Sequence, residues 1–261
     1  MLLLWSQTLA AQPSYTLTIP ASLNGDKGKN QYVEVLLEQI FSSQGFKLNI
    51  IYSNIPSNKV RTAKLLSQSK AIDLFWANAR TDITQQLHAI KQPIYDGYIG
   101  YRLLLISDKK LVDLSKVTTV QQLSAYTAVQ KKDWLDYEIL INNGLKVNGN
   151  LSFTAMFKAV EQGLADYFPR SILEIDRELV RFGSSQLEIE PNLIIKYSSA
   201  SYFYVNKQNK ELADIVQRGF QAIIENGDFE KHFNEYFGKI IRDHKLNDRQ
   251  VIELENPFFL K

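Results

Sequence analysis

The chain has 261 residues, of which 45% are hydrophobic and 22% charged, so a disordered or collagen-like chain is excluded. Thirty basic and 28 acidic residues leave a net charge of +2, which provides no field for a polyanion, and we expect no nucleic-acid partner. No apolar run reaches the roughly 18 residues that a membrane-spanning helix needs. The lack of cysteine excludes disulfides, thiolate metal sites and a cysteine nucleophile.

The first twelve residues are expected to be the remainder of a secretory signal. Residues 1–5 are apolar and residues 6–12 are small and polar, which is typical of the end of a signal peptide. The basic segment that should precede them is missing, which points either to a start codon placed too late or to an ordinary exposed tail. We therefore begin the fold at Pro13 and predict an exported protein.

Strands and helices alternate along the chain, which predicts an α/β fold with parallel sheets. In the first part, apolar patterns predict strands at 15–20, 46–52, 71–77 and 98–106. A helix with apolar residues at helical spacing follows the first strand and ends at Gly45, and a second helix is expected over 60–69.

The same alternation continues in the second part of the chain. Strands are expected at 127–129, 165–168, 193–197 and 202–205. Helices are expected at 134–143, 153–160, 212–224 and 229–240. Thr118 and Gln121 have the spacing of a capping box. Pro169 stands where a first helical residue is favoured, so we expect a helix to begin there.

No catalytic group is recognisable in the sequence. His88, His232 and His244 lack the i, i+4 spacing of a zinc-binding helix, and no G-x-S-x-G elbow is present. Carboxylates such as Asp133 and Asp166 are candidates for acid–base work, but most such groups are solvated or salt-bridged. We therefore predict a protein that is not an enzyme, with no metal or other cofactor.

Three segments place aromatic and polar side chains after predicted strands, where open α/β sheets bind ligands. These segments contain Trp76, Asn78 and Arg80; Trp134 and Asp136; and Tyr167, Arg170 and Glu174. We expect the two tryptophans to be stacking walls and Asn78 a hydrogen-bond partner. Arg80 and Arg170 are expected to clamp an anion, because arginine holds a carboxylate with two hydrogen bonds.

The remaining candidates have supporting roles. Tyr167 is expected to add an edge contact, and Asp136 or Glu174 to orient an arginine or to meet a ligand ammonium. The alternative is structural: Trp76 then belongs to the core, and Arg170 pairs only with Glu174, its i+4 neighbour.

Four motifs then carry a family resemblance. They are GYRLLLI at 100–106, WLDYEIL at 134–140, DYFPR at 166–170 followed by Glu174, and VIELENP at 251–257. With these motifs in family order, residues 13–261 resemble a divergent branch of the bacterial extracellular solute-binding proteins of family 3, which have the periplasmic type 2 binding fold.

The resemblance implies two α/β lobes joined by two crossing strands. Lobe 1 would comprise 13–103 and 198–261, lobe 2 would comprise 108–193, and the hinge crossings would lie at 104–107 and 194–197. A solute would be held between the lobes, which would close over it by hinge motion.

The resemblance also implies a function. The protein would be a monomer that captures a small polar or anionic solute, amino-acid-like or an organic acid, and presents it to an ABC-transporter permease or a sensor kinase. One departure bears on the ligand: where amino-acid receptors of the family carry a carboxylate-binding arginine, residues 83–87 read ITQQL, and Arg80 is the nearest substitute. The alternatives are a small cyclic-acid dehydratase on the same fold and a ligand-sensing signalling domain without a transport role.

Overall fold

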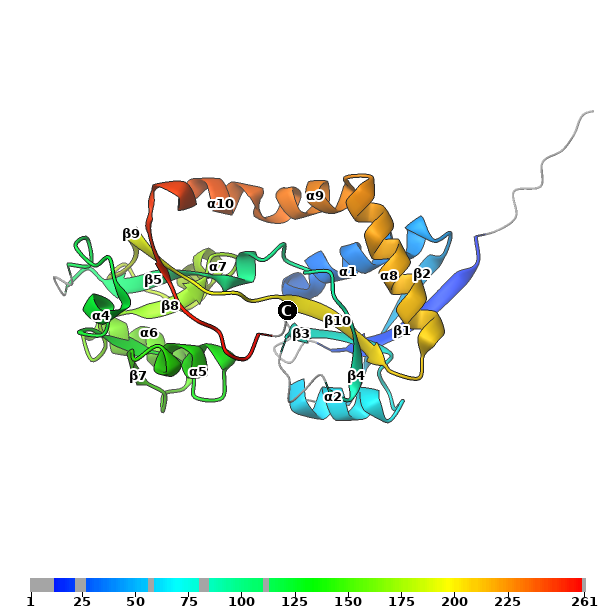
Figure 1. Ribbon diagram of the computed structural model, residues 1–261, viewed down its shortest axis with the longest axis horizontal. Coiled ribbons are helices and arrows are strands. Elements are labelled where there is room, and N and C mark those ends of the chain that lie inside the picture. The colour runs from blue at the N-terminus through cyan, green and yellow to red at the C-terminus, as the bar shows by residue number, and fades with distance from the viewer. Residues whose placement is uncertain (1–11, 22–26, 56–58, 80–84, 110–112, 260–261) are drawn as a thin grey trace, which may run out of the picture. The chain divides into compact units, whose positions relative to one another are not determined.

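The computed structural model describes residues 12–21, 27–55, 59–79, 85–109 and 113–259 (Figure 1). The chain divides into two compact units. Unit 1 comprises Met1–Ala77, Asp82–Gln92 and Tyr202–His232, and unit 2 comprises Asn78–Thr81, Pro93–Ser201 and Phe233–Lys261. The expected signal remnant lies almost wholly outside the described residues and stays a prediction.

Unit 1 is built from two small sheets and the helices that cover them. Its elements are β1 (Ser14–Pro20), α1 (Lys27–Ser43), β2 (Lys47–Ser53), α2 (Lys59–Ser67), β3 (Leu74–Asn78), β4 (Leu87–Ile90), β10 (Ser201–Asn206), α8 (Lys210–Glu225) and α9 (Asp228–Phe233). Strands β1 and β2 pair in parallel, and the other sheet has the order β3-β10-β4. The helices predicted around residues 33–41, 60–69 and 212–224 are all present.

Helix α1 buries the face that its apolar spacing predicts. Val33, Leu36, Leu37, Ile40 and Phe41 are all fully buried. Helix α8 packs closely against this helix because Gly219 has no side chain: a Cβ there would lie 2.3 Å from the Ile40 carbonyl oxygen.

Unit 2 contains the larger sheet. Its elements are β5 (Tyr101–Ser107), α4 (Val120–Leu123), β6 (Thr127–Val129), α5 (Leu135–Asn142), β7 (Lys146–Asn148), α6 (Phe153–Glu161), β8 (Phe168–Ser171), α7 (Ile175–Phe182), β9 (Leu187–Lys196), α10 (Lys239–Asp243) and β11 (Gln250–Glu253). Two 3₁₀ turns lie at Tyr98–Gly100 and Leu246–Asp248, and a π-helical turn lies at Asn234–Gly238. The main sheet has the order β11-β9-β5-β8, and β6 pairs in parallel with β7. Among the described residues, every helix is too short or too polar to cross a membrane.

The unit boundaries differ from the lobes expected from the resemblance. Strand β5 pairs antiparallel with β9, so the crossings expected at 104–107 and 194–197 lie inside one sheet of unit 2. Strand β11 pairs in parallel with the same β9, which places the C-terminal residues in unit 2 rather than in the first lobe. Sheet pairing between distant segments, which no local pattern records, is the physical reason for both differences.

Two local predictions also need correction. Pro169 does not begin a helix: it lies in β8 opposite Leu104, and α7 begins only at Ile175. Strand β8 is an edge strand, and an edge tolerates proline because the missing N–H is not needed by a neighbouring strand. The capping interaction lies one residue later than predicted, with the Gln122 N–H donating to the Thr119 hydroxyl at 3.2 Å.

Candidate functional site

Arg170 is the centre of a buried ion-pair cluster in unit 2. Its Nε donates to Glu178 Oε2 and its Nη2 to Glu178 Oε1, both at 2.6 Å, which is a bidentate arrangement. The same Nη2 donates to Glu174 Oε2 at 3.3 Å. The predicted i+4 pairing with Glu174 is therefore confirmed, and Glu178 on α7 is an additional partner.

Three aromatic rings surround the Arg170 guanidinium. Its Cζ lies 5.0 Å from the ring centroid of Trp134, 5.1 Å from that of Phe168 and 5.5 Å from that of Phe153. Burial by itself would lower the pKa of Arg170, but the hydrogen bonds and charge of Glu178 outweigh it and raise the pKa above its usual value. The guanidinium is thus kept charged inside an aromatic and carboxylate shell.

Arg102 forms a second buried pair close by. Its Nη2 lies 2.6 Å from Asp136 Oδ1, and its Nε donates to the Tyr197 hydroxyl at 2.6 Å. The Tyr197 hydroxyl in turn donates to Asp136 Oδ1. Strand β5, the start of α5 and the segment after β9 are joined by these three side chains.

Because the Tyr197 phenol is buried, the free energy of unfolding should depend on pH in the alkaline range. Burial raises the pKa of Tyr197 well above 10, and the charge of Asp136 adds to this, while Arg102 opposes it. Above pH 10 the unfolded chain therefore loses this proton while the folded chain keeps it.

We expect the free energy of unfolding to fall as the pH rises above 10, with a contribution from Tyr197 of about 1.4 kcal/mol per pH unit. Denaturant unfolding of the wild type and of Tyr197→Phe measures this slope. The measurements run from pH 9 to pH 11, about one unit on either side of the ordinary tyrosine pKa. The variant should show a shallower decline, and equal slopes for both proteins would contradict the expectation.

Taken together, the Arg170 cluster and the Arg102 pair carry more negative than positive charge. Their three carboxylates, Asp136, Glu174 and Glu178, face the two guanidiniums of Arg102 and Arg170, which gives these five groups a net charge of −1. The arginine side chains are only 5% and 6% exposed, whereas the carboxylates are 13%, 27% and 10% exposed. Of the three carboxylates, Glu174 is the most exposed to solvent.

The structure brings four of the predicted site residues together. Trp134 precedes the first turn of α5 and contacts Arg170, which pairs with Glu174. Asp136 lies in that turn and pairs with Arg102 in the second buried pair. Trp134 is half-buried and leaves part of its surface open.

The other four predicted residues are placed differently. Tyr167 is fully buried in the hydrophobic core of unit 2, and its expected edge contact with a solute stays a prediction. Trp76 is half-buried in β3 and belongs to unit 1, and Asn78 accepts a hydrogen bond from the Ser201 hydroxyl at 2.6 Å. Arg80 lies outside the described residues, so its clamp role stays a prediction.

Sequence reasoning missed Arg102, Tyr197 and Glu178 as members of this cluster. Arg102 carries a signal that was available, because a charged residue inside the apolar strand 101–107 requires a buried partner. Glu178 follows Glu174 at i+4 and faces the same way on α7, which is also a readable pattern. Tyr197 shows no comparable local signal.

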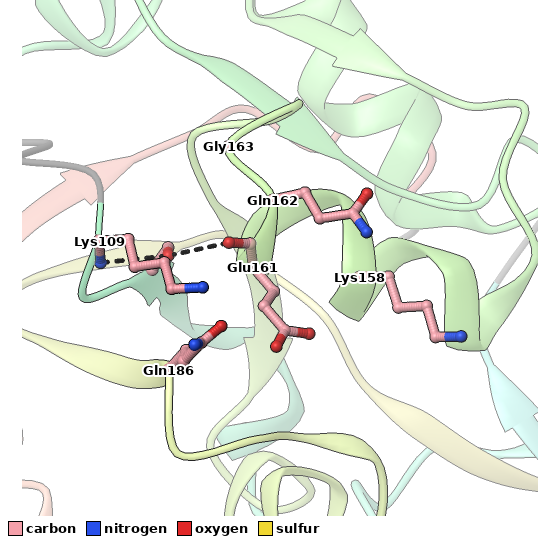
Figure 2. Close-up of a pocket in the computed structure, with 7 residues that line it drawn as sticks. Lys109, Lys158, Glu161, Gln162, Gly163 and Gln186 are labelled. Carbon is pink, nitrogen blue, oxygen red and sulfur yellow. Dashed lines mark hydrogen bonds between the residues drawn. The ribbon is translucent and has the colours of Figure 1, made fainter.

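A separate polar hollow of about 710 Å³ opens on unit 2 (Figure 2). It is lined by Ser107, Lys109, Lys158, Glu161, Gln162, Gly163 and Gln186, none of which is a predicted site residue. Its buried hydroxyl, Ser107 Oγ, already donates to the Glu161 carbonyl at 3.3 Å, and both lysines are exposed. The hollow therefore offers a ligand mainly flexible surface side chains. In the described part of the chain, no three His, Asp or Glu side chains are grouped so as to hold a metal ion.

The sequence matches no protein-family model and no curated protein. The fold, in contrast, is similar to that of several solved binding proteins. An ancestral arginine-binding protein bound to arginine superimposes with a TM-score of 0.58 at 14% identity, over 85% of this chain and 98% of the other. A Salmonella typhimurium periplasmic binding protein described as highly specific for arginine gives 0.57 at 12% identity, over 85% and 99%.

A third solved structure extends this similarity. The substrate-binding protein of an amino acid ABC transporter gives a TM-score of 0.55 at 14% identity, over 86% of this chain and 100% of the other. All three likenesses span nearly the full length of the solved proteins and most of this chain. The fold predicted from the resemblance is thus confirmed, and the chain has the α/β fold of the type 2 periplasmic binding proteins.

Proposed function

We propose that this protein is a solute-binding protein that captures an amino-acid-like solute in the periplasm and presents it to a membrane transporter. The fold is the observation that carries this proposal, because three solved proteins similar to it are described as arginine-binding or as part of an amino acid transporter. A permease as the partner is a part of the proposal that rests on the same likeness.

The cluster in unit 2 supports a solute with a protonated amine or guanidinium over a simple organic acid. Arg102 and Arg170 direct hydrogen bonds to carboxylates of their own chain, so an incoming anion would have to displace Asp136 or Glu178. Glu174 and the half-buried Trp134 both contact the Arg170 guanidinium, and the combination of a carboxylate and an aromatic face is chemistry that suits a cation.

Binding rather than catalysis is the activity we propose. The carboxylates of the cluster are engaged in hydrogen bonds and ion pairs with Arg102 and Arg170, which is not the arrangement of a free acid–base pair. A receptor of this kind returns its solute unchanged, whereas an enzyme on the same fold would convert it.

Thermal unfolding with arginine as the probe tests the proposal. At 100 times its dissociation constant, a ligand that binds only the folded state stabilises it by about 2.7 kcal/mol, which should raise the midpoint by several degrees. Citrate serves as the anionic comparison and should give a smaller shift. Calorimetry with Glu174→Gln should show weaker arginine binding, with little change in the midpoint of the free protein. No shift with arginine or any other amino acid, or recovery of a converted solute, would overturn the proposal.

A further inference from the structure

Five aromatic rings join two parts of unit 2 that lie far apart in the sequence. Tyr98 stacks on Phe233 with ring centroids 5.3 Å apart and planes inclined at 28°. Tyr95 meets the edge of Phe237 at 6.1 Å, Phe233 contacts Phe237 at 5.2 Å, and Tyr98 contacts Tyr101 at 5.4 Å. We call these five residues the aromatic clamp. Ring pairs of this geometry stabilise contacts beyond the effect of the buried area alone.

Main-chain contacts tie the first of these parts, residues 93–100, to a third segment at residues 197–201. The Ile94 N–H donates to the Ser201 carbonyl at 2.9 Å, and the Tyr197 N–H donates to the Gly100 carbonyl at 3.2 Å. The approach at Gly100 is so close that a Cβ would lie 2.1 Å from the Tyr197 carbonyl oxygen. Only glycine permits this contact without a backbone shift.

The three fastened segments lie at three of the crossings through which the chain enters or leaves unit 2. At these crossings the chain enters unit 2 after Gln92, leaves it after Ser201 and enters it again after His232. The short stretch Asn78–Thr81, which also belongs to unit 2, accounts for the other two crossings. The last entry continues directly into the π-helical turn at Asn234–Gly238, which carries Phe237. Such turns are rare and are frequently found at functional sites.

We propose that the aromatic clamp fastens residues 93–100, 197–201 and 233–238 into one rigid body with the rest of unit 2. At these three crossings, any hinge motion between the units then bends the chain at the unit 1 side of the clamp, close to Gln92, Tyr202 and His232. Hinges are commonly a few residues at the ends of elements that absorb the change in backbone angles, and the clamp limits where such residues can lie. The inference concerns the hinge and does not depend on which solute is bound.

Native-state hydrogen exchange of the full chain without solute tests this inference. In the wild type, the amides of Ile94 and Tyr197 should be protected to within about tenfold of Val129, whose N–H donates to the Tyr167 carbonyl inside unit 2. Phe233→Leu should raise exchange at Ile94 and Tyr197 by about tenfold or more relative to Val129, because loss of the ring frees the segments. Phe237→Leu, with a less buried ring, should act in the same direction and serves if Phe233→Leu fails to fold.

Phe229→Leu is the matched control. Phe229 also lies in α9, but it belongs to unit 1 and packs on Phe220 with centroids 5.2 Å apart. This variant should leave the relative exchange of Ile94 and Tyr197 unchanged. The inference is overturned if both clamp variants leave these amides as protected as in the wild type. It is also overturned if Phe229→Leu raises the exchange of these amides as much as the clamp variants do. Arginine binding has no part in this readout, so failure of the proposed function would be distinguishable.

Discussion

Arg170→Met should lower the free energy of unfolding by about 3–5 kcal/mol, because it leaves a buried carboxylate without its cation. The Arg170 side chain is 6% exposed and that of Glu178 is 10% exposed, so solvent cannot replace the two 2.6 Å hydrogen bonds that the guanidinium supplies. The stacked contacts with Trp134, Phe153 and Phe168 are lost at the same time. Urea denaturation at neutral pH, monitored by tryptophan fluorescence, measures the change.

Two further variants separate this mechanism from a general sensitivity to mutation. Removing both partners, as in Arg170→Met with Glu178→Leu, should recover a large part of the loss, since no uncompensated charge is left buried. Lys131→Met breaks the exposed pair with Asp133 and should change stability by less than about 1 kcal/mol. A loss for Arg170→Met no larger than that for Lys131→Met would show that the cluster contributes little to stability.

Arg102→Met should also lower the free energy of unfolding by about 3–5 kcal/mol, through the second buried pair. The Arg102 side chain is 5% exposed and that of Asp136 is 13% exposed. Without the guanidinium, Asp136 would keep only the hydrogen bond from the Tyr197 hydroxyl among its described side-chain partners. The start of α5, which carries Trp134 and Asp136, would then lose its anchor to β5.

Tyr197→Phe provides the graded comparison for this prediction. It removes one hydroxyl but keeps the ion pair, so the expected loss is only about 1–3 kcal/mol. A double-mutant cycle between Arg102→Met and Asp136→Asn should give a coupling energy of about 1–3 kcal/mol, as expected for groups in direct contact. Additive losses in that cycle would mean that the two side chains stabilise the fold independently.

Local patterns were sufficient for most of the secondary structure. The apolar spacing around Val33–Phe41 predicts the buried face of α1, and similar spacing predicts α6 and α8. These predictions succeed because helical periodicity depends on residues three and four positions apart. Pro169 shows the limit: its local preference was for a helix start, but pairing with Leu104 placed it in an edge strand.

The sequence by itself determined the alternation of strands and helices, the likeness to a solute-binding fold and the choice of Trp134, Asp136, Arg170 and Glu174 as neighbours of interest. Only the tertiary structure decided which side chains these residues contact. Tyr197 and Asp136 are 61 positions apart, and Arg102 and Tyr197 are 95 apart, so their bond network exists only once β5, β9 and α5 are assembled. Tyr167 lies in the core for the same reason, since burial depends on packing between distant elements and not on neighbours in the chain.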